Sequence, residues 1–116
     1  MKNYTEIISL NLIFKISKLY KMSLTKLDQL REYSDPEYVM ARAHEMGLNP
    51  VHESSRKDKK YMIFDGNKMV HFGQMFYEDY TKHLDPKRRM NFRKRNWRWE
   101  FTPKYSASNL SFTLLW

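Results

Sequence analysis

The chain has 116 residues, and at roughly 100–200 residues per domain this length predicts a single domain. Its 21 basic and 13 acidic side chains leave a net charge of +8, which favours acidic partners such as nucleic acid, anionic lipid or an acidic protein surface. Because the sequence contains no cysteine, it excludes disulfide bonds, thiolate metal sites and cysteine nucleophiles.

Residues 1–22 are predicted to form an apolar N-terminal arm. The apolar stretch 7–14 is followed by Lys15, Lys18 and Lys21. This stretch cannot cross a bilayer, which requires about 20 residues, and no pair of small residues marks a signal-peptide cleavage site. We expect an arm that packs on another surface, with contact to a membrane surface or a signal segment as alternatives. Residues 23–116 then form one small basic domain.

Two helices are predicted before the first strand. Ser23 is a suitable N-cap for a short helix, and the leucines of this helix recur at three-residue spacing: Leu24, Leu27 and Leu30. The segment 34–37 has the pattern of a capping box, with Ser34 as the cap and a proline in the first turn. This second helix should continue to about residue 46 and stop at Gly47. Its apolar face, which should cover the sheet, consists of Val39, Ala43 and Met46.

The middle of the sequence predicts an antiparallel sheet. Residues 61–64 and 68–72 are apolar segments of strand length on either side of the turn sequence at 65–67, Asp-Gly-Asn. Residues 51–53 can supply a third strand. The expected fold class is therefore α+β: a small antiparallel hairpin or three-stranded sheet packed by short helices. One core cluster is expected to bury Tyr61, Ile63, Val70, Phe72, Trp97 and Leu114.

Three further segments are predicted to be helical after the sheet. Residues 74–83 should form one or two turns whose packing residues are Phe76, Tyr77 and Tyr80. Asp85 as the cap and Pro86 in the first position begin the next helix, and the Thr-Pro pair at 102–103 ends it. Ser106 can cap a last short helix.

The strongest signal for function is the segment 86–99, which carries seven basic residues and no acidic one. The candidate binding residues for nucleic acid or an acidic partner are Lys87, Arg88, Arg89, Arg93, Lys94, Arg95 and Arg98. Met90 and Trp97 should lie on a different side and dock the helix. Five of the seven are arginines, which suit bidentate contacts to phosphate or carboxylate. Aromatic rings between the charges are typical of nucleic-acid stacking surfaces.

Three interpretations of this basic segment remain open. The cations can contact the phosphates of nucleic acid, they can contact an acidic protein, or they can be a solvated surface. In the third case neighbouring carboxylates would pair with the arginines, and the available ones are Glu78, Asp79, Asp85 and Glu100.

The sequence does not predict an enzyme, and it predicts neither a metal nor a cofactor. No two of the four histidines are spaced i, i+4 as in a helical zinc site, and no glycine-rich phosphate loop is present. His71 and His83 could meet Asp79 or Asp85 in space, but no catalytic motif supports such a site. The expected role of His71 is that of a half-buried, hydrogen-bonded strand residue.

The second half of the chain contains a succession of short motifs that mix basic, aromatic and hydroxyl residues. They lie at 56–61, 70–73, 79–89, 91–95, 105–107, 110–111 and 114–116. Over about residues 50–116 this succession resembles an uncharacterised family of short basic proteins encoded by giant and other large double-stranded DNA viruses. The resemblance implies a viral origin rather than a known activity.

Such an origin implies a non-enzymatic virion structural protein of minor-capsid or cement type. The expected partners are capsid or other virion proteins and double-stranded DNA. The expected location is the virion, and the host cytoplasm during assembly. The alternative is a basic nucleic-acid-binding protein that acts in genome packaging or transcription.

Deletion of residues 1–21 should leave the domain folded but weaken its assembly with partner proteins, because the apolar arm belongs to no predicted helix–sheet unit. Thermal melting of the truncated chain measures the first effect. A truncated chain that does not fold would show that the arm is part of the core.

Overall fold

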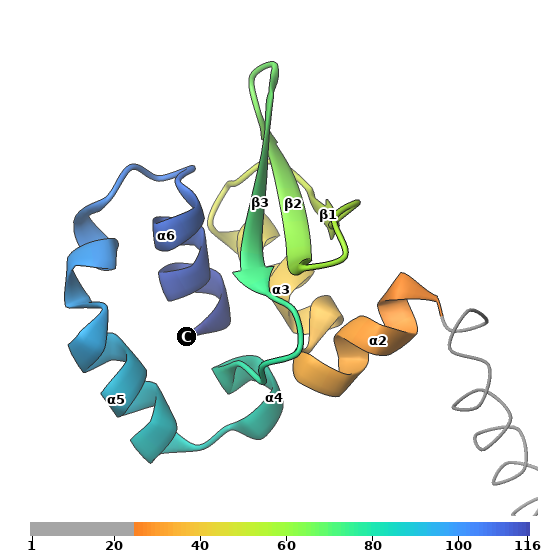
Figure 1. Ribbon diagram of the computed structural model, residues 1–116. Helices are drawn as coiled ribbons and strands as arrows, with labels where there is room; N and C mark the ends of the chain where they lie inside the picture. The colour runs from red at the N-terminus through yellow and green to blue at the C-terminus, as the bar shows by residue number, and fades with distance from the viewer. Residues whose placement is uncertain (1–24) are drawn as a thin grey trace, which may run out of the picture.

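The computed structural model describes residues 25–116, which form three strands and several short helices (Figure 1). The elements in chain order are α2 (Lys26–Tyr33), α3 (Pro36–Glu45), β1 (Val51–Glu53), β2 (Lys59–Asp65), β3 (Lys68–Gln74), α4 (Tyr80–His83), α5 (Pro86–Arg95), the 3₁₀ helix η2 (Trp97–Phe101), α6 (Ala107–Leu110) and the π-helical turn η3 (Ser111–Leu115). The predicted α+β class is confirmed. Within residues 25–116, no helix is both long and apolar enough to cross a membrane.

The first two described helices begin at caps one or two residues away from the predicted ones. Thr25 caps α2 through a capping box with Asp28, whereas the predicted cap Ser23 lies outside the described residues. Asp35, not Ser34, caps α3, because its carboxylate accepts a hydrogen bond from the amide of Tyr38. Ser34 is instead buried and hydrogen-bonded to other side chains. The α3 helix stops as predicted, before Gly47 at φ +71°.

The three strands form one antiparallel sheet in the order β1-β2-β3. Ile63 lies at the centre of the register, opposite Val51 on β1 and Val70 on β3. Gly66 adopts a φ of +62° in the tight turn between β2 and β3, the left-handed conformation that glycine tolerates best. The predicted hairpin and the third strand are both confirmed.

The core lies between the sheet, α3 and the C-terminal segment α6–η3 (Figure 1). Its buried members are Leu30, Val39, Ala43, Leu48, Val51, Tyr61, Ile63, Phe72, Met75, Leu110, Leu114 and Leu115. Four of the six predicted core residues are in this cluster, and Val70 packs against it while partly exposed. The helix face predicted for α3 is buried at two of its three positions, since Met46 is exposed.

Trp97 is not a core residue, so this part of the prediction is wrong. Its side chain is 54% exposed, and so is that of Met90, its predicted docking partner. The prediction assumed a continuous helix from 86 to 99, but α5 ends at Arg95 and Asn96 leaves helical geometry at φ −114°, ψ 26°. Trp97 therefore starts a separate 3₁₀ helix and does not continue the row that contains Met90.

The packing predicted for residues 74–83 is also wrong in two of three places. Phe76 and Tyr77 are exposed, whereas Met75 is buried in the core. Phe76 has a φ of +74°, so the chain turns sharply directly after β3 instead of forming a helix there. Only the last part of this segment is helical, as α4, and Tyr80 on that helix is half-buried.

Gly73 allows the end of β3 to approach the C-terminal segment closely. A Cβ atom at this position would lie 2.8 Å from Cδ1 of Leu115 and 3.2 Å from Cβ of Lys60. Its φ of +78° is also strained for residues with a side chain. Glycine at this position therefore lets η3 pack directly on the sheet.

The burial pattern predicts unequal costs for two aromatic truncations. Phe72→Ala should lower the free energy of unfolding by about 3–5 kcal/mol, because it leaves a cavity in the core. Trp97→Ala should change it by only about 0.5 kcal/mol, as is usual for exposed positions. Urea denaturation of both variants measures the difference, and a large loss for Trp97→Ala would contradict the exposed placement.

Candidate functional site

The basic helix α5 begins where its local sequence predicts. Asp85 is the N-cap, and its carboxylate accepts hydrogen bonds from the amides of Lys87 and Arg88 at 3.0 and 3.4 Å. Pro86 occupies the first turn, where its missing N–H costs nothing. No residue of α5 is buried, and the helix lies on the outer side of the C-terminal segment (Figure 1).

Two of the seven predicted binding residues hold the helix in place. Arg89 Nε and Arg93 Nη2 donate hydrogen bonds to the main-chain oxygen of Trp116 at 2.9 and 3.1 Å. The guanidinium of Arg89 also lies over the ring of Tyr80, and that of Arg93 over the ring of Phe112. Burial lowers the pKa of Arg93. These two arginines are therefore structural, which the sequence did not indicate.

The other five predicted binding residues are exposed: Lys87, Arg88, Lys94, Arg95 and Arg98. Within residues 25–116, carboxylates neutralise little of this charge. Arg88 lies 3.8 Å from Glu78, and both side chains are about half exposed to solvent, which weakens their attraction. Asp85 caps α5, and Asp79 is buried in an ion pair elsewhere. Within residues 25–116, Arg88 is thus the one of these five cations that lies near a carboxylate as an ion pair.

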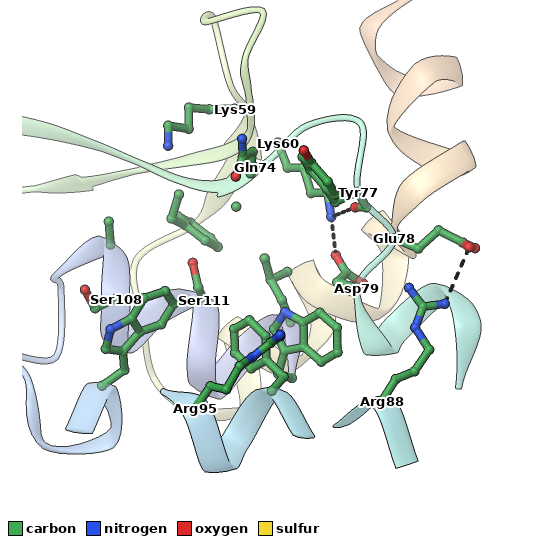
Figure 2. A pocket seen from close by; sticks show the side chains of 17 residues that line it. Lys59, Lys60, Gln74, Tyr77, Glu78, Asp79, Arg88, Arg95, Ser108 and Ser111 are labelled. Carbon is green, nitrogen blue, oxygen red and sulfur yellow. Dashed lines mark hydrogen bonds and ion pairs between the residues drawn. The ribbon is translucent and has the colours of Figure 1, made fainter. Parts of the chain in front are cut away.

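A cavity of about 450 Å³ separates α5 from the end of the sheet. Its lining combines residues of β2, β3 and the segment that follows them with residues of α5, η2, α6 and η3 (Figure 2). Arg88 and Arg95 reach it from α5, whereas the other exposed cations of the basic segment do not line it. The polar lining residues are Lys59, Lys60, Gln74, Tyr77, Glu78, Asp79, Arg88, Arg95, Ser108 and Ser111.

The sheet-side wall of the cavity contains a buried ion pair. Lys60 Nζ lies 3.0 Å from Asp79 Oδ2, and the two side chains are 3% and 1% exposed (Figure 2). The ammonium also donates to the main-chain oxygens of Tyr77 at 2.6 Å and Tyr33 at 3.3 Å, so all three of its donors are used. Burial lowers the pKa of Lys60, against the opposing effect of the nearby Asp79 carboxylate.

A chain of hydroxyl groups leads from the core to the same carboxylate. Tyr61 donates to Ser34 Oγ at 2.6 Å, and Thr81 donates to Asp79. The remaining bond, 3.1 Å between Ser34 and Thr81, is then donated by Ser34, since the Thr81 hydrogen is already used. Each of these hydroxyl groups, and the carboxylate of Asp79, has a hydrogen-bond partner. A buried polar network is stable only when its groups are paired in this way.

The helix-side wall of the cavity is aromatic. Phe92 on α5 and Trp116 stack face to face, with ring centroids 4.1 Å apart and an interplanar angle of 5°. Trp99 on η2 meets Phe92 edge to face at 5.7 Å. All three rings line the cavity, and all three are partly exposed. The aromatic residues of the basic segment are Phe92, Trp97 and Trp99. Phe92 and Trp99 line the cavity together, whereas Trp97 does not line it.

His71 and His83 form hydrogen bonds with different residues. His71 is half-buried and bonded to Ser54 Oγ at 2.7 Å, as predicted for a strand histidine. His83 Nδ1 accepts from the amide of Asp85 at 3.0 Å, and its ring lies against Trp116. In the part of the chain that the structure describes, no group of three or more histidine and acidic side chains could hold a metal ion.

The fold and the site together define a small basic α+β protein with an exposed cationic helix and an adjacent aromatic cavity. Residues 50–96 match a family of unknown function, DUF5754. The match covers the sheet, α4 and α5, but not Trp99, Ser108 or Trp116 in the cavity wall. No curated protein and no solved structure is similar to the chain at a significant level.

Asp79→Asn should destabilise the fold by about 3–5 kcal/mol, because it leaves the buried Lys60 ammonium without its counter-charge. Chemical denaturation measures this loss. The double variant Lys60→Met with Asp79→Asn removes both charges and should recover part of it. A single variant as stable as the unmodified chain would show that the pair does not support the fold.

Proposed function

We propose that this chain is a non-enzymatic virion structural protein whose basic helix contacts packaged double-stranded DNA. The observation that carries the DNA contact is the set of five exposed cations on α5 and η2, which carboxylates within residues 25–116 leave largely unneutralised. Phosphate contacts by such cations provide most of the non-specific affinity for DNA.

The viral setting of this proposal rests on the succession of motifs in residues 50–116 and on the small, basic character of the chain. In that setting the protein would lie in the virion, and in the host cytoplasm during assembly. The apolar arm would contact neighbouring capsid proteins or a membrane surface. The arm lies outside the described residues, so its role rests on its sequence alone.

An acidic shell protein is the second candidate partner of the basic helix. The exposed apolar side chains beside the cations favour it, since Met90, Trp97 and Phe101 are all more than half exposed. Protein interfaces are enriched in aromatic residues, methionine and arginine. The two candidates predict different behaviour of the isolated protein. If DNA is the partner, the protein should bind duplex DNA, and this binding should weaken with salt.

Binding of the full chain to a duplex of about 30 bp should weaken steeply with salt. Five phosphate contacts predict a log–log slope near −4.5, at about −0.9 per contact. Replacing Lys87, Lys94 and Arg98 together with alanine should flatten this slope by up to about 2.7 units. Fluorescence anisotropy at several salt concentrations measures both values.

The matched control replaces three exposed cations outside the basic helix with alanine: Lys57, Lys68 and Lys104. It changes the net charge equally and should leave the slope within about one unit of the unmodified value. Absence of duplex binding even at low salt would remove DNA as the partner and leave the acidic shell protein.

A further inference from the structure

We propose that the cavity beside α5 is a binding site for one unpaired nucleotide. Its base would stack on the aromatic wall and its phosphate would lie at Arg95. This site goes beyond duplex contact by α5, because it requires a base that is outside a double helix and uses residues on both sides of the cavity.

The size of the cavity and the origin of its walls fit a small ligand. Its volume of about 450 Å³ lies within the range of about 300–1,000 Å³ that is usual for small-molecule sites. One wall is fixed by the buried Lys60–Asp79 pair, and the other by the stack of Phe92 on Trp116. Both walls are thus held by interactions within the fold, so the site exists before a ligand binds.

The charges that line the cavity favour an anion. Four cations and two carboxylates contribute to the lining, which leaves a formal charge of +2. Asp79 neutralises Lys60 at 3.0 Å, and Glu78 lies 3.8 Å from Arg88. Lys59 and Arg95 line the cavity without an ion pair within residues 25–116, Lys59 on the side of the sheet and Arg95 on the side of α5 (Figure 2). An arginine is well suited to two parallel hydrogen bonds with a phosphate group.

The rings that line the cavity favour a planar ligand. Trp99, Phe92 and Trp116 form the helix-side wall, and Tyr77 lines the opposite side although its residue is 66% exposed. An exposed aromatic ring at the mouth of a cavity offers a stacking surface that the fold itself does not use. A nucleobase between such rings gains stacking on its face.

Polar groups that line the cavity beside the aromatic rings can contact the edge of the base. Ser108 and Ser111 lie on α6 and η3 at the cavity, and the amide of Gln74 reaches it from β3 (Figure 2). Hydroxyl and amide groups both donate and accept hydrogen bonds. The combination of an anion site, stacking faces and edge contacts describes a nucleotide better than an acidic peptide, which has no planar ring system to match the aromatic wall.

Isothermal titration of the full chain with thymidine monophosphate tests the proposal, with thymidine and inorganic phosphate as separate probes. The monophosphate should bind at least tenfold more tightly than either fragment, because only it engages both the rings and Arg95. Equal affinity for inorganic phosphate, or no binding of the monophosphate at millimolar concentration, would overturn the proposal.

Ser108→Phe is the test variant, because the new ring would occupy the cavity without removing a cation. It should weaken binding of the monophosphate at least tenfold. Arg95→Gln should also weaken it, by a smaller factor. A second plugging variant, Ser111→Phe, keeps the test valid if the first does not fold. A folded plugged variant that binds as well as the unmodified chain would overturn the proposal.

A short oligothymidylate shows whether the cavity binds a nucleotide within a single strand or a free nucleotide. A site for unpaired bases in a strand should bind the oligonucleotide more tightly than the monophosphate, and Ser108→Phe should reduce both affinities. A site for free nucleotides should prefer the monophosphate. Either preference supports nucleotide binding at the cavity, whereas oligonucleotide binding that Ser108→Phe leaves unchanged would contradict it.

The same variants separate this site from the proposed duplex contact. Ser108→Phe should leave the salt slope for duplex DNA unchanged. The triple replacement of Lys87, Lys94 and Arg98, none of which lines the cavity, should flatten that slope without affecting the monophosphate. If the unmodified chain binds the duplex but not the monophosphate, or the monophosphate but not the duplex, the proposal for the missing activity has failed.

Discussion

The ion pair between Lys60 and Asp79 fixes the position of the segment that joins the sheet to α4. Its ammonium joins β2 to the carbonyl of Tyr77 and to the end of α2 at Tyr33. Its carboxylate is also bonded to Thr81, at the start of α4. The segment between β3 and α4 has few apolar anchors, since Phe76 and Tyr77 are exposed and Met75 is its buried apolar side chain. Polar contacts therefore replace hydrophobic packing where the chain turns toward the basic helix.

A buried pair of this kind determines geometry more than it adds stability. Removing two charges from water costs several kcal/mol each, so the net contribution of a satisfied pair is small, while breaking it is costly. The hydrogen-bonded hydroxyl groups of Tyr61, Ser34 and Thr81 further restrict the geometry, because each donates to one acceptor in the series that ends at Asp79. Alternative arrangements of the turn would leave at least one of these groups unpaired. The pair thus specifies one path for the chain from the sheet to α5.

The elements that the sequence predicted well are those that depend on neighbouring residues. The hairpin follows from the turn around Gly66, the helix at Asp85-Pro86 from its cap and first turn, and the last helix from Ser106. Strand alternation correctly placed Tyr61, Ile63 and Phe72 in the core. These signals act over a few residues, so a single sequence is enough to recognise them.

The features that could not be predicted from the sequence depend on residues that are far apart along the chain. Lys60 and Asp79 are 19 positions apart, and no local pattern marks either as buried. Trp97 was predicted to be in the core because the helix was extended by periodicity past its true end. The α5 helix stops before Asn96, and Trp97 is exposed. The assignment of Arg89 and Arg93 to the Trp116 oxygen likewise needs the fold, since only the fold brings α5 to the C-terminal segment.

The positions of the tryptophans have a spectroscopic consequence. All three lie within residues 97–116, and two of them line the cavity while the third is exposed beside it. The core around the sheet contains tyrosine and phenylalanine but no tryptophan. Indole emission therefore reports mainly on the helix-side wall and its solvent, since no tryptophan lies in a strand. Loosening of α5 would therefore change indole emission even while the sheet is still intact.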